Sequence, residues 1–213
     1  MISTHRKEVI NDVANSMNEK LGSRKITLPM KPDEIEAMEE VIQTLNCESH
    51  YQYGQIVRYR LMLEYGFKSE VLLDLRLEQF DEEKLSLNLE CDEDTHFKLF
   101  LDEELGNMLK RYCEMNCKKD RKWLFTNSNG KKIASPYIMD ELRKRAKENF
   151  NIVGFSPMAT GLTGVQKLLE KGMTIAEIKM ITGFRIQKID DVAEYMLMAQ
   201  DIEKVINEKL SEK

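Results

Sequence analysis

The sequence contains no apolar run approaching the roughly 20 residues that a helix needs to cross a bilayer, although 42% of its 213 residues are hydrophobic. Its polar beginning, MISTHRKEVIND, also lacks the apolar segment of a secretory signal. Internal repeats and low-complexity linkers are missing as well. We therefore expect a cytoplasmic protein with no membrane partner, built around one core of ordinary size.

Cysteine is scarce, with four in the chain. Cys47 and Cys91 stand alone, and Cys113 and Cys117 have helical i, i+4 spacing instead of a C-x-x-C spacing. Free, buried thiols in a reducing compartment are the simplest interpretation. Metal binding by Cys47 with His50, or by the Cys113 pair, would need further ligands that the sequence does not offer, so we predict no metal and no cofactor.

An excess of positive charge is also lacking, because the formal net charge is −5. The charge is unevenly distributed: residues 1–100 hold 12 Lys or Arg against 20 Asp or Glu, and residues 101–213 hold 20 against 17. The segment 106–147 is the most basic, with 12 basic residues against four acidic ones. Such a segment is often only a solvated surface, yet on an acidic protein it can also contact phosphates.

Hydrophobic periodicity predicts a mostly helical chain with one small sheet. The stretches LSLNLE and FKLFL alternate like two strands, and WLFT is the predicted third strand. We predict an α+β domain, mostly α, over residues 27–213, with a small three-stranded antiparallel sheet and an N-terminal docking helix within residues 1–26. The other predicted helices cover 31–45, 53–66, 68–76, 135–150, 156–172, 174–183 and 189–210.

Two stretches resemble the catalytic domain of tyrosine recombinases, the phage-integrase family. LEYGFKSEVLLDLRLEQFD and SPMATGLTGVQKLLEKGMTIAEIKMITGF each align with a characteristic segment of that family without a gap. The resemblance covers about residues 27–200 and depends on frame residues such as Gly66, Leu75, Pro157 and Gly183. It implies the fold of that catalytic domain, with helices around a small sheet and a tyrosine near the C-terminal end.

The resemblance also implies where the catalytic groups would lie. In the family, a tyrosine attacks a DNA phosphate while arginines, histidines and a lysine stabilise the negative charge that develops on it. Carried over by position, the two arginines fall on Lys68 and Gly161, and two histidines fall on Met158 and Phe184. Tyr195 stands in the nucleophile's place, although its helical apolar face gives it the alternative role of a packed core residue.

Only Lys68 keeps a positive charge among these positions, so the resemblance implies a degenerate, inactive site. Since Met158, Leu162 and Phe184 are apolar, we expect the former catalytic pocket to close into the core. Gly161 would let an adjacent segment approach its helix, as would Gly164 on the same helix.

The sheet turn that carries a lysine in the family is acidic in this sequence, and its nearest cationic or titratable residues are His96 and Lys98. We interpret the protein as a non-catalytic, recombinase-derived DNA-binding protein, a repressor or regulator from a phage or mobile element, with double-stranded DNA as its partner. The predicted DNA-contacting residues are basic: Arg143, Lys144, Lys147, Lys118, Lys119, Arg121, Lys122, Lys131, Lys132, Arg185 and Lys188.

Three alternatives stay open. Arg145 or Lys147 could simply pair with Glu141 or Glu148 on a solvated helix surface. The protein could instead be an interaction module that associates with itself, or modulates an active recombinase or repressor, through its apolar C-terminal helix without binding DNA. The third alternative is an active recombinase with atypical catalytic residues that uses Tyr195.

Overall fold

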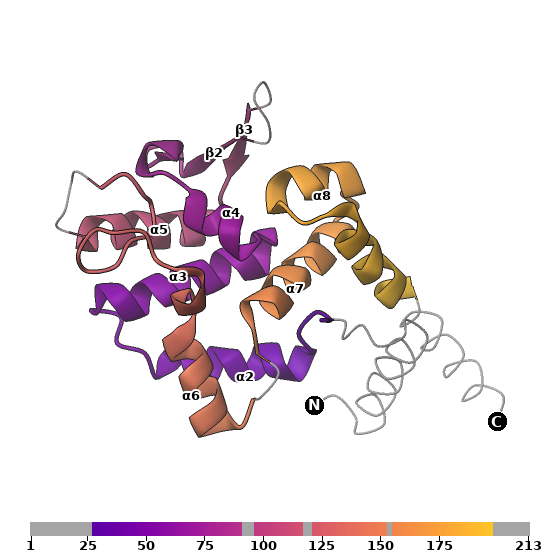
Figure 1. Cartoon of the computed structure of the whole chain (residues 1–213), viewed down its shortest axis with the longest axis horizontal. Helices are drawn as coiled ribbons and strands as arrows, with labels where there is room; N and C mark the ends of the chain where they lie inside the picture. The colour runs from indigo at the N-terminus through magenta and orange to yellow at the C-terminus, as the bar shows by residue number, and fades with distance from the viewer. Residues whose placement is uncertain (1–26, 91–95, 117–120, 153–154, 198–213) are drawn as a thin grey trace.

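The computed structural model describes residues 27–90, 96–116, 121–152 and 155–197. The predicted docking helix at 1–26 and the end of the last predicted helix lie outside these residues. Figure 1 shows helices gathered around α3, with the sheet at the top and α7 and α8 to the right. The helices are α2 (Pro32–Gln43), α3 (His50–Tyr65), α4 (Ser69–Asp74), α5 (Glu103–Met115), α6 (Asp140–Phe150), α7 (Pro157–Glu170), α8 (Ile175–Thr182) and a helix over 186–197.

The central helix α3 is buried on nearly every side. Ser49 caps its start by accepting a hydrogen bond from the backbone N–H of Gln52, and Gly66 ends it with a φ of 67°. Because neighbours surround the helix, its polar side chains are enclosed along with its apolar ones, and Arg58 is only 1% exposed. A buried polar group must find a partner inside the protein, and α3 bonds to other segments accordingly.

Helix α7 packs closely against α3, as the glycines of its sequence indicated. A Cβ atom at Gly164 would lie 2.4 Å from both the Met62 carbonyl oxygen and the Gly66 nitrogen. Only glycine permits this approach of two backbones. The expectation that Gly164 lets an adjacent segment approach its helix is confirmed.

The three-stranded antiparallel sheet in a mostly helical domain is confirmed, but one of its predicted strands is wrong. The strand order is β1 (Phe80–Asp81), β2 (Ser86–Glu90) and β3 (His96–Phe100), with Leu87 opposite Leu99. The WLFT segment contributes only two isolated bridges, from Trp123 to Arg76 and from Thr126 to Lys132. The third strand is instead a two-residue segment, too short to show alternation in the sequence.

The basic helix begins later than its sequence predicts. Ser135–Tyr137 forms one short 3-10 turn (η2), the chain turns sharply at Met139, and α6 starts at Asp140. Met139 has no side-chain oxygen to cap the helix, and Gln55 of α3 accepts the hydrogen bond from the Leu142 N–H in its place, at 3.0 Å. A cap from another helix leaves no local mark in the sequence, so the start was misplaced. Helix α5 was missed altogether.

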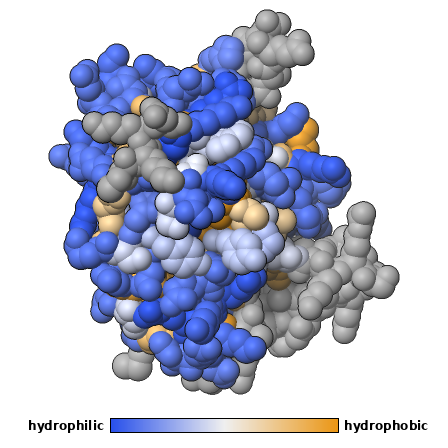
Figure 2. Space-filling view, turned by 60° about the vertical axis from the view of Figure 1, so that its left-hand side comes forward, coloured by the Kyte–Doolittle hydropathy of each residue, from blue (hydrophilic) through white to orange (hydrophobic). Residues whose placement is uncertain are grey.

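The surface and the thiols complete the fold. None of the helices in the described ranges has the length and apolar character that a membrane span requires. The face in Figure 2 is mainly hydrophilic, with small separate hydrophobic areas. Cys113 is buried as expected, and burial raises the pKa of its thiol to about 11. Cys47 is exposed, so the expectation of a buried thiol is wrong there.

Candidate functional site

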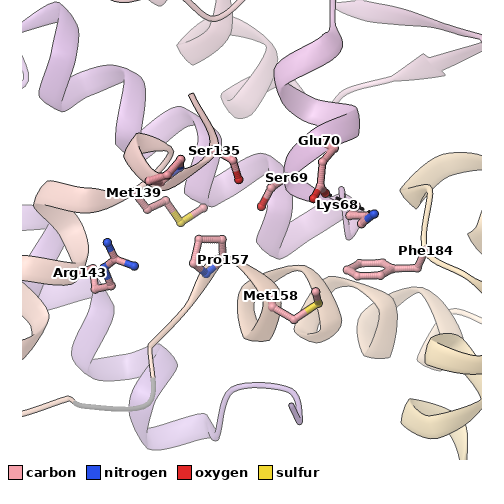
Figure 3. A pocket seen from close by; sticks show the side chains of 10 residues that line it. Lys68, Ser69, Glu70, Ser135, Met139, Arg143, Pro157, Met158 and Phe184 are labelled. Atoms are coloured by element: carbon pink, nitrogen blue, oxygen red, sulfur yellow. Dashed lines mark ion pairs between the residues drawn. The ribbon is translucent and has the colours of Figure 1, made fainter. Parts of the chain in front are cut away.

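A pocket of about 350 Å³ opens where the start of α4, the segment before α6, and the start of α7 meet (Figure 3). It brings together Lys68, Met158 and Phe184, three of the positions that the recombinase resemblance singles out. Lys68 immediately precedes α4, Met158 lies in the first turn of α7, and Phe184 follows α8. The remaining lining residues are Ser69, Glu70, Ser135, Pro136, Met139, Arg143 and Pro157.

The pocket has a cationic part and an apolar part. The Lys68 ammonium lies 3.4 Å from a Glu70 carboxylate oxygen. Arg143 reaches the pocket from α6, and its exposed side chain makes no ion pair with another residue in the described ranges. The hydroxyl groups of Ser69 and Ser135 face the same space. Two cations and two hydroxyl groups are a suitable lining for a phosphate.

The expectation that this pocket closes into the core is wrong in part. Leu162 and Phe184 are buried as expected, at 0% and 3% exposure. Met158 is 38% exposed and forms part of the pocket wall. The pocket therefore stays open at Met158, in the first turn of α7.

Gly161, at the position of the family's second arginine, lies under the Phe184 ring. A Cβ atom there would meet the ring at 3.1 Å and the Phe67 carbonyl oxygen at 3.0 Å. Phe184, at the position of the family's last histidine, therefore fills the space that a longer side chain at Gly161 would need. The expectation that Gly161 allows a close approach is confirmed.

Tyr195 is half-buried on the helix 186–197 and does not belong to the described lining of the pocket. Burial raises the pKa of its phenol, and the negative charge of Glu34 raises it further. A nucleophilic phenol would need cationic neighbours that favour its ionised form. The described lining includes no histidine, so the pocket offers two cations and two hydroxyl groups to an anion but no imidazole.

The hairpin residues lie outside the pocket. His96 is exposed on β3, and the Lys98 ammonium lies 3.9 Å from an Asp81 carboxylate oxygen on the neighbouring part of the sheet. Neither residue is among those that line the pocket.

The predicted DNA-contacting residues lie in different surroundings in the structure. Arg143, Lys144 and Lys147 are exposed on α6, and Lys122, Lys131 and Arg185 are also exposed. Lys132 pairs with Asp74, the last residue of α4, and Lys188 pairs with Asp191 at 3.2 Å. Lys122 and Lys132 both lie over the Trp123 ring, at 4.9 and 4.6 Å from its centroid. Lys118 and Lys119 lie outside the described residues.

Arg121 needs a correction, because it is not a surface residue. It is 8% exposed, and its guanidinium donates hydrogen bonds of 3.3 Å to the carbonyl groups of Cys113 and Asn116. A buried guanidinium that holds the end of α5 cannot contact DNA. Lys122, the next residue in the charge pattern, is exposed, and the sequence carries no signal that separates Arg121 from it.

Arg145 follows the alternative interpretation. Its guanidinium lies 2.8 Å from a Glu141 carboxylate oxygen, four residues earlier on α6, and it also donates to the Thr44 carbonyl group. Lys147 makes no ion pair within the described residues. Helix α6 therefore presents one face to the protein through Arg145 and another to solvent.

The mostly helical domain with a small antiparallel sheet is structurally similar to tyrosine recombinase catalytic domains. Among solved structures, XerA recombinase matches with a TM-score of 0.60 and 16% identity, over 83% of this chain and 66% of that one. XerH site-specific recombinase, bound to a palindromic difH substrate in a post-cleavage complex, matches with 0.65 and 14% identity, over 85% and 53%. Tn1549 transposon integrase, in complex with transposon right end DNA, matches with 0.57 and 17%, over 79% and 62%.

These similarities establish the fold. The chain spans less than two thirds of the length of each of these relatives. No protein-family model and no curated protein sequence matches the chain.

Proposed function

We propose that this chain is a recombinase-derived protein that binds double-stranded DNA without cutting it, as a repressor or structural subunit of a phage or other mobile element. Two of the structural relatives, XerH recombinase and Tn1549 integrase, were solved with DNA. The same fold here carries an open pocket with two cationic side chains, which supports contact with the DNA backbone.

The observation that carries the proposal is the composition of the pocket. Lys68 and Arg143 remain to attract a phosphate, whereas the family's histidine and arginine positions hold Met158 and Gly161. Removing one preorganised donor of a catalytic site raises the barrier by about 3 kcal/mol, and losing several cooperating groups abolishes the chemistry. Phosphate contact needs only charge and hydrogen-bond donors, so binding survives the loss of cleavage.

The exposed cations of α6 provide the main part of the proposed surface. Arg143 enters the pocket, and Lys144 and Lys147 lie exposed on the same helix. Lys122 and Lys132 both lie over the ring of Trp123. The ion pair between Lys132 and Asp74 places them beside the end of α4. Helix α4 therefore has cationic side chains near both of its ends, and this arrangement suits a DNA backbone that runs along the helix.

Two measurements on the full chain test the proposal. Fluorescence anisotropy with labelled duplexes at several salt concentrations should give an affinity that falls with salt, by a logarithmic slope of about −0.9 per phosphate neutralised. A suicide substrate, followed by denaturing electrophoresis, should give no covalent protein–DNA adduct. An adduct that disappears in Tyr195→Phe would instead identify an active recombinase.

A protein-interaction module is the second candidate, and exposed apolar side chains near the end of the described chain favour it. Ile186 and Leu197, on the helix 186–197, are 50% and 62% exposed. Sedimentation of the protein alone and with an active recombinase would distinguish the two functions. Stable assembly without salt-dependent DNA affinity would support the interaction module and overturn the DNA-binding proposal.

A further inference from the structure

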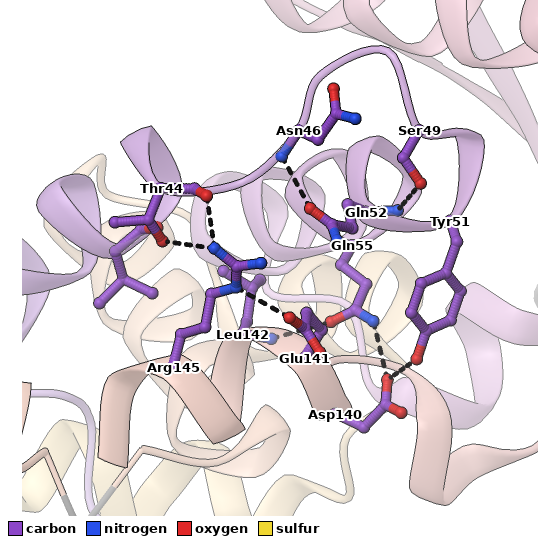
Figure 4. A network of polar contacts seen from close by, with 11 residues as sticks. Thr44, Asn46, Ser49, Tyr51, Gln52, Gln55, Asp140, Glu141, Leu142 and Arg145 are labelled. Carbon is purple, nitrogen blue, oxygen red and sulfur yellow. Dashed lines mark hydrogen bonds and ion pairs between the residues drawn. The ribbon is translucent and has the colours of Figure 1, made fainter. Parts of the chain in front are cut away.

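The first turn of α6 is held by residues of α3. Gln55 Oε1 accepts a hydrogen bond of 3.0 Å from the Leu142 N–H, and Gln55 Nε2 donates one of 2.7 Å to Asp140 Oδ1. The Tyr51 hydroxyl donates to the same Asp140 oxygen (Figure 4). Gln55 of α3 therefore caps α6, and Gln55 and Tyr51 together hold Asp140, the first residue of α6.

Arg58 of α3 adds a contact with Ile138, two residues before the start of α6. Its buried Nε donates a hydrogen bond of 2.9 Å to the Ile138 carbonyl oxygen, and its guanidinium carbon lies 5.6 Å from the centre of the Phe125 ring. Burial lowers the pKa of Arg58, while Tyr112, Tyr51 and Asp140 act in the opposite direction. A buried guanidinium is costly unless it is hydrogen-bonded, and Nη2 of Arg58 has no hydrogen-bond partner within the described residues. The Nε bond to Ile138 therefore ties Arg58 to the chain before α6.

The contacts with α3 and the pocket lie on different sides of the same turn. The side chains of α3 bond to Ile138, Asp140 and Leu142. The pocket is lined by Met139 and Arg143, which are one turn apart and joined by a backbone hydrogen bond of 2.9 Å. The contacts that fix Ile138, Asp140 and Leu142 therefore also fix the direction of Arg143.

We propose that Tyr51, Gln55 and Arg58 are positioning residues for DNA binding: they set the start of α6 so that Arg143 points into the pocket. These three residues, at i, i+4 and i+7 on one side of α3, are called the α3 clamp below. The inference rests on the proposed DNA-binding function, because Arg143 is the group whose placement it explains.

The physical reason is preorganisation. An arginine side chain loses rotamer freedom when it binds a phosphate, and a helix end that is already fixed reduces that loss. If the first turn of α6 loosens, the phosphate must order both the turn and the side chain. We expect loosening of the clamp to weaken DNA binding about five- to tenfold, within the usual range for groups that act through one another.

Gln55→Met tests the clamp because it keeps the length of the side chain and removes both hydrogen bonds. The matched control is Gln52→Met on the same helix, since Gln52 Oε1 accepts from the Asn46 N–H at 2.7 Å in the α2–α3 connection. Affinity for one duplex is measured for Gln55→Met, Arg143→Ala and the double variant. We expect a five- to tenfold loss in Gln55→Met that disappears when Arg143 is already Ala, and less than a twofold change in Gln52→Met.

Strictly additive effects of Gln55→Met and Arg143→Ala would overturn the proposal, because the clamp would then act only on general stability. If Gln55→Met does not fold, Tyr51→Phe replaces it in the same cycle, since it removes a single hydroxyl from an exposed side chain. Additive effects of Tyr51→Phe and Arg143→Ala would again overturn the proposal, and non-additive effects would support it.

Amide exchange at Leu142 separates failure of the clamp from failure of the proposed function. We expect faster exchange at this N–H in Gln55→Met than in Gln52→Met, whether or not DNA binds. Unchanged exchange would refute the clamp by itself. An Arg143→Ala variant with undiminished affinity would refute the DNA-binding surface, even if exchange at Leu142 had accelerated.

Discussion

The ring of Phe184 lies against Gly161, and the sequence resemblance matches both positions to catalytic groups of tyrosine recombinases. A Cβ atom on Gly161 would meet the ring Cζ at 3.1 Å, which is tighter than ordinary van der Waals contact. The two positions are therefore coupled: the absence of a side chain at Gly161 leaves the space that the Phe184 ring occupies.

An arginine at position 161 should destabilise the protein. We expect Gly161→Arg to lower the free energy of unfolding by about 3 kcal/mol, because the new side chain collides with Phe184 and the Phe67 carbonyl group. The double variant Gly161→Arg/Phe184→Ala should lose less than the sum of the single losses, by about 1–2 kcal/mol. Urea unfolding of the four proteins measures this, and simple additivity would contradict the coupling.

Gly164→Ala should be more damaging than its small size suggests. Its methyl group would lie 2.4 Å from the backbone of α3, so two helices must move apart. We expect a loss of at least about 3 kcal/mol, although alanine favours a helix by about 1 kcal/mol over glycine. Gln166→Ala on the same helix is the control, with an expected change within about 0.5 kcal/mol. Equal thermal stability of the two variants would show that α7 and α3 are not closely packed.

Helices whose ends are marked locally could be predicted from the sequence. Ser156 caps α7 ahead of Pro157, and α8 is bounded by Thr174 and Gly183, whose φ is 72°. Each of these residues lies next to the helix start or end that it marks, so periodicity and capping residues were enough to predict these helices. The start of α6 was misplaced because its cap comes from Gln55, more than 80 residues earlier.

The site was predictable only where the family resemblance reached. Lys68, Met158 and Phe184 were matched by position, and the structure brings them together. Arg143 was assigned to DNA on the basis of charge alone. Its entry into the same pocket depends on how α6 packs on α3, a tertiary contact that periodicity does not encode.

Stability should fall in mild acid because of His50. Burial, together with the nearby charges of Arg121 and Arg58, lowers the pKa of its imidazole from 6.5 to about 4. Between about pH 6.5 and pH 4 the unfolded chain therefore binds a proton that the folded protein does not, so the free energy of unfolding decreases as the pH falls. We expect a loss of about 1–2 kcal/mol from this group, since the ring is partly exposed.

His50→Phe is the matched variant for this measurement, because a phenyl ring can keep the stacking on Tyr112, where the ring centres are 4.5 Å apart. Urea unfolding at pH 7 and pH 4.5 should show a smaller loss in the variant than in the natural protein. An identical loss in both would assign the pH dependence to carboxylates elsewhere.

Arg143 and Arg145 lie two residues apart on α6 and should behave differently. Arg143 has no ion-pair partner among the described residues and reaches the pocket, so Arg143→Ala should weaken binding about tenfold for every duplex and reduce the salt slope by about 1. Arg145 is engaged by Glu141 and Thr44, so Arg145→Ala should lower stability and change affinity less than twofold. Anisotropy titrations across salt concentrations compare the two. Equal losses of affinity would mean that general charge, and not the geometry of the pocket, attracts the DNA.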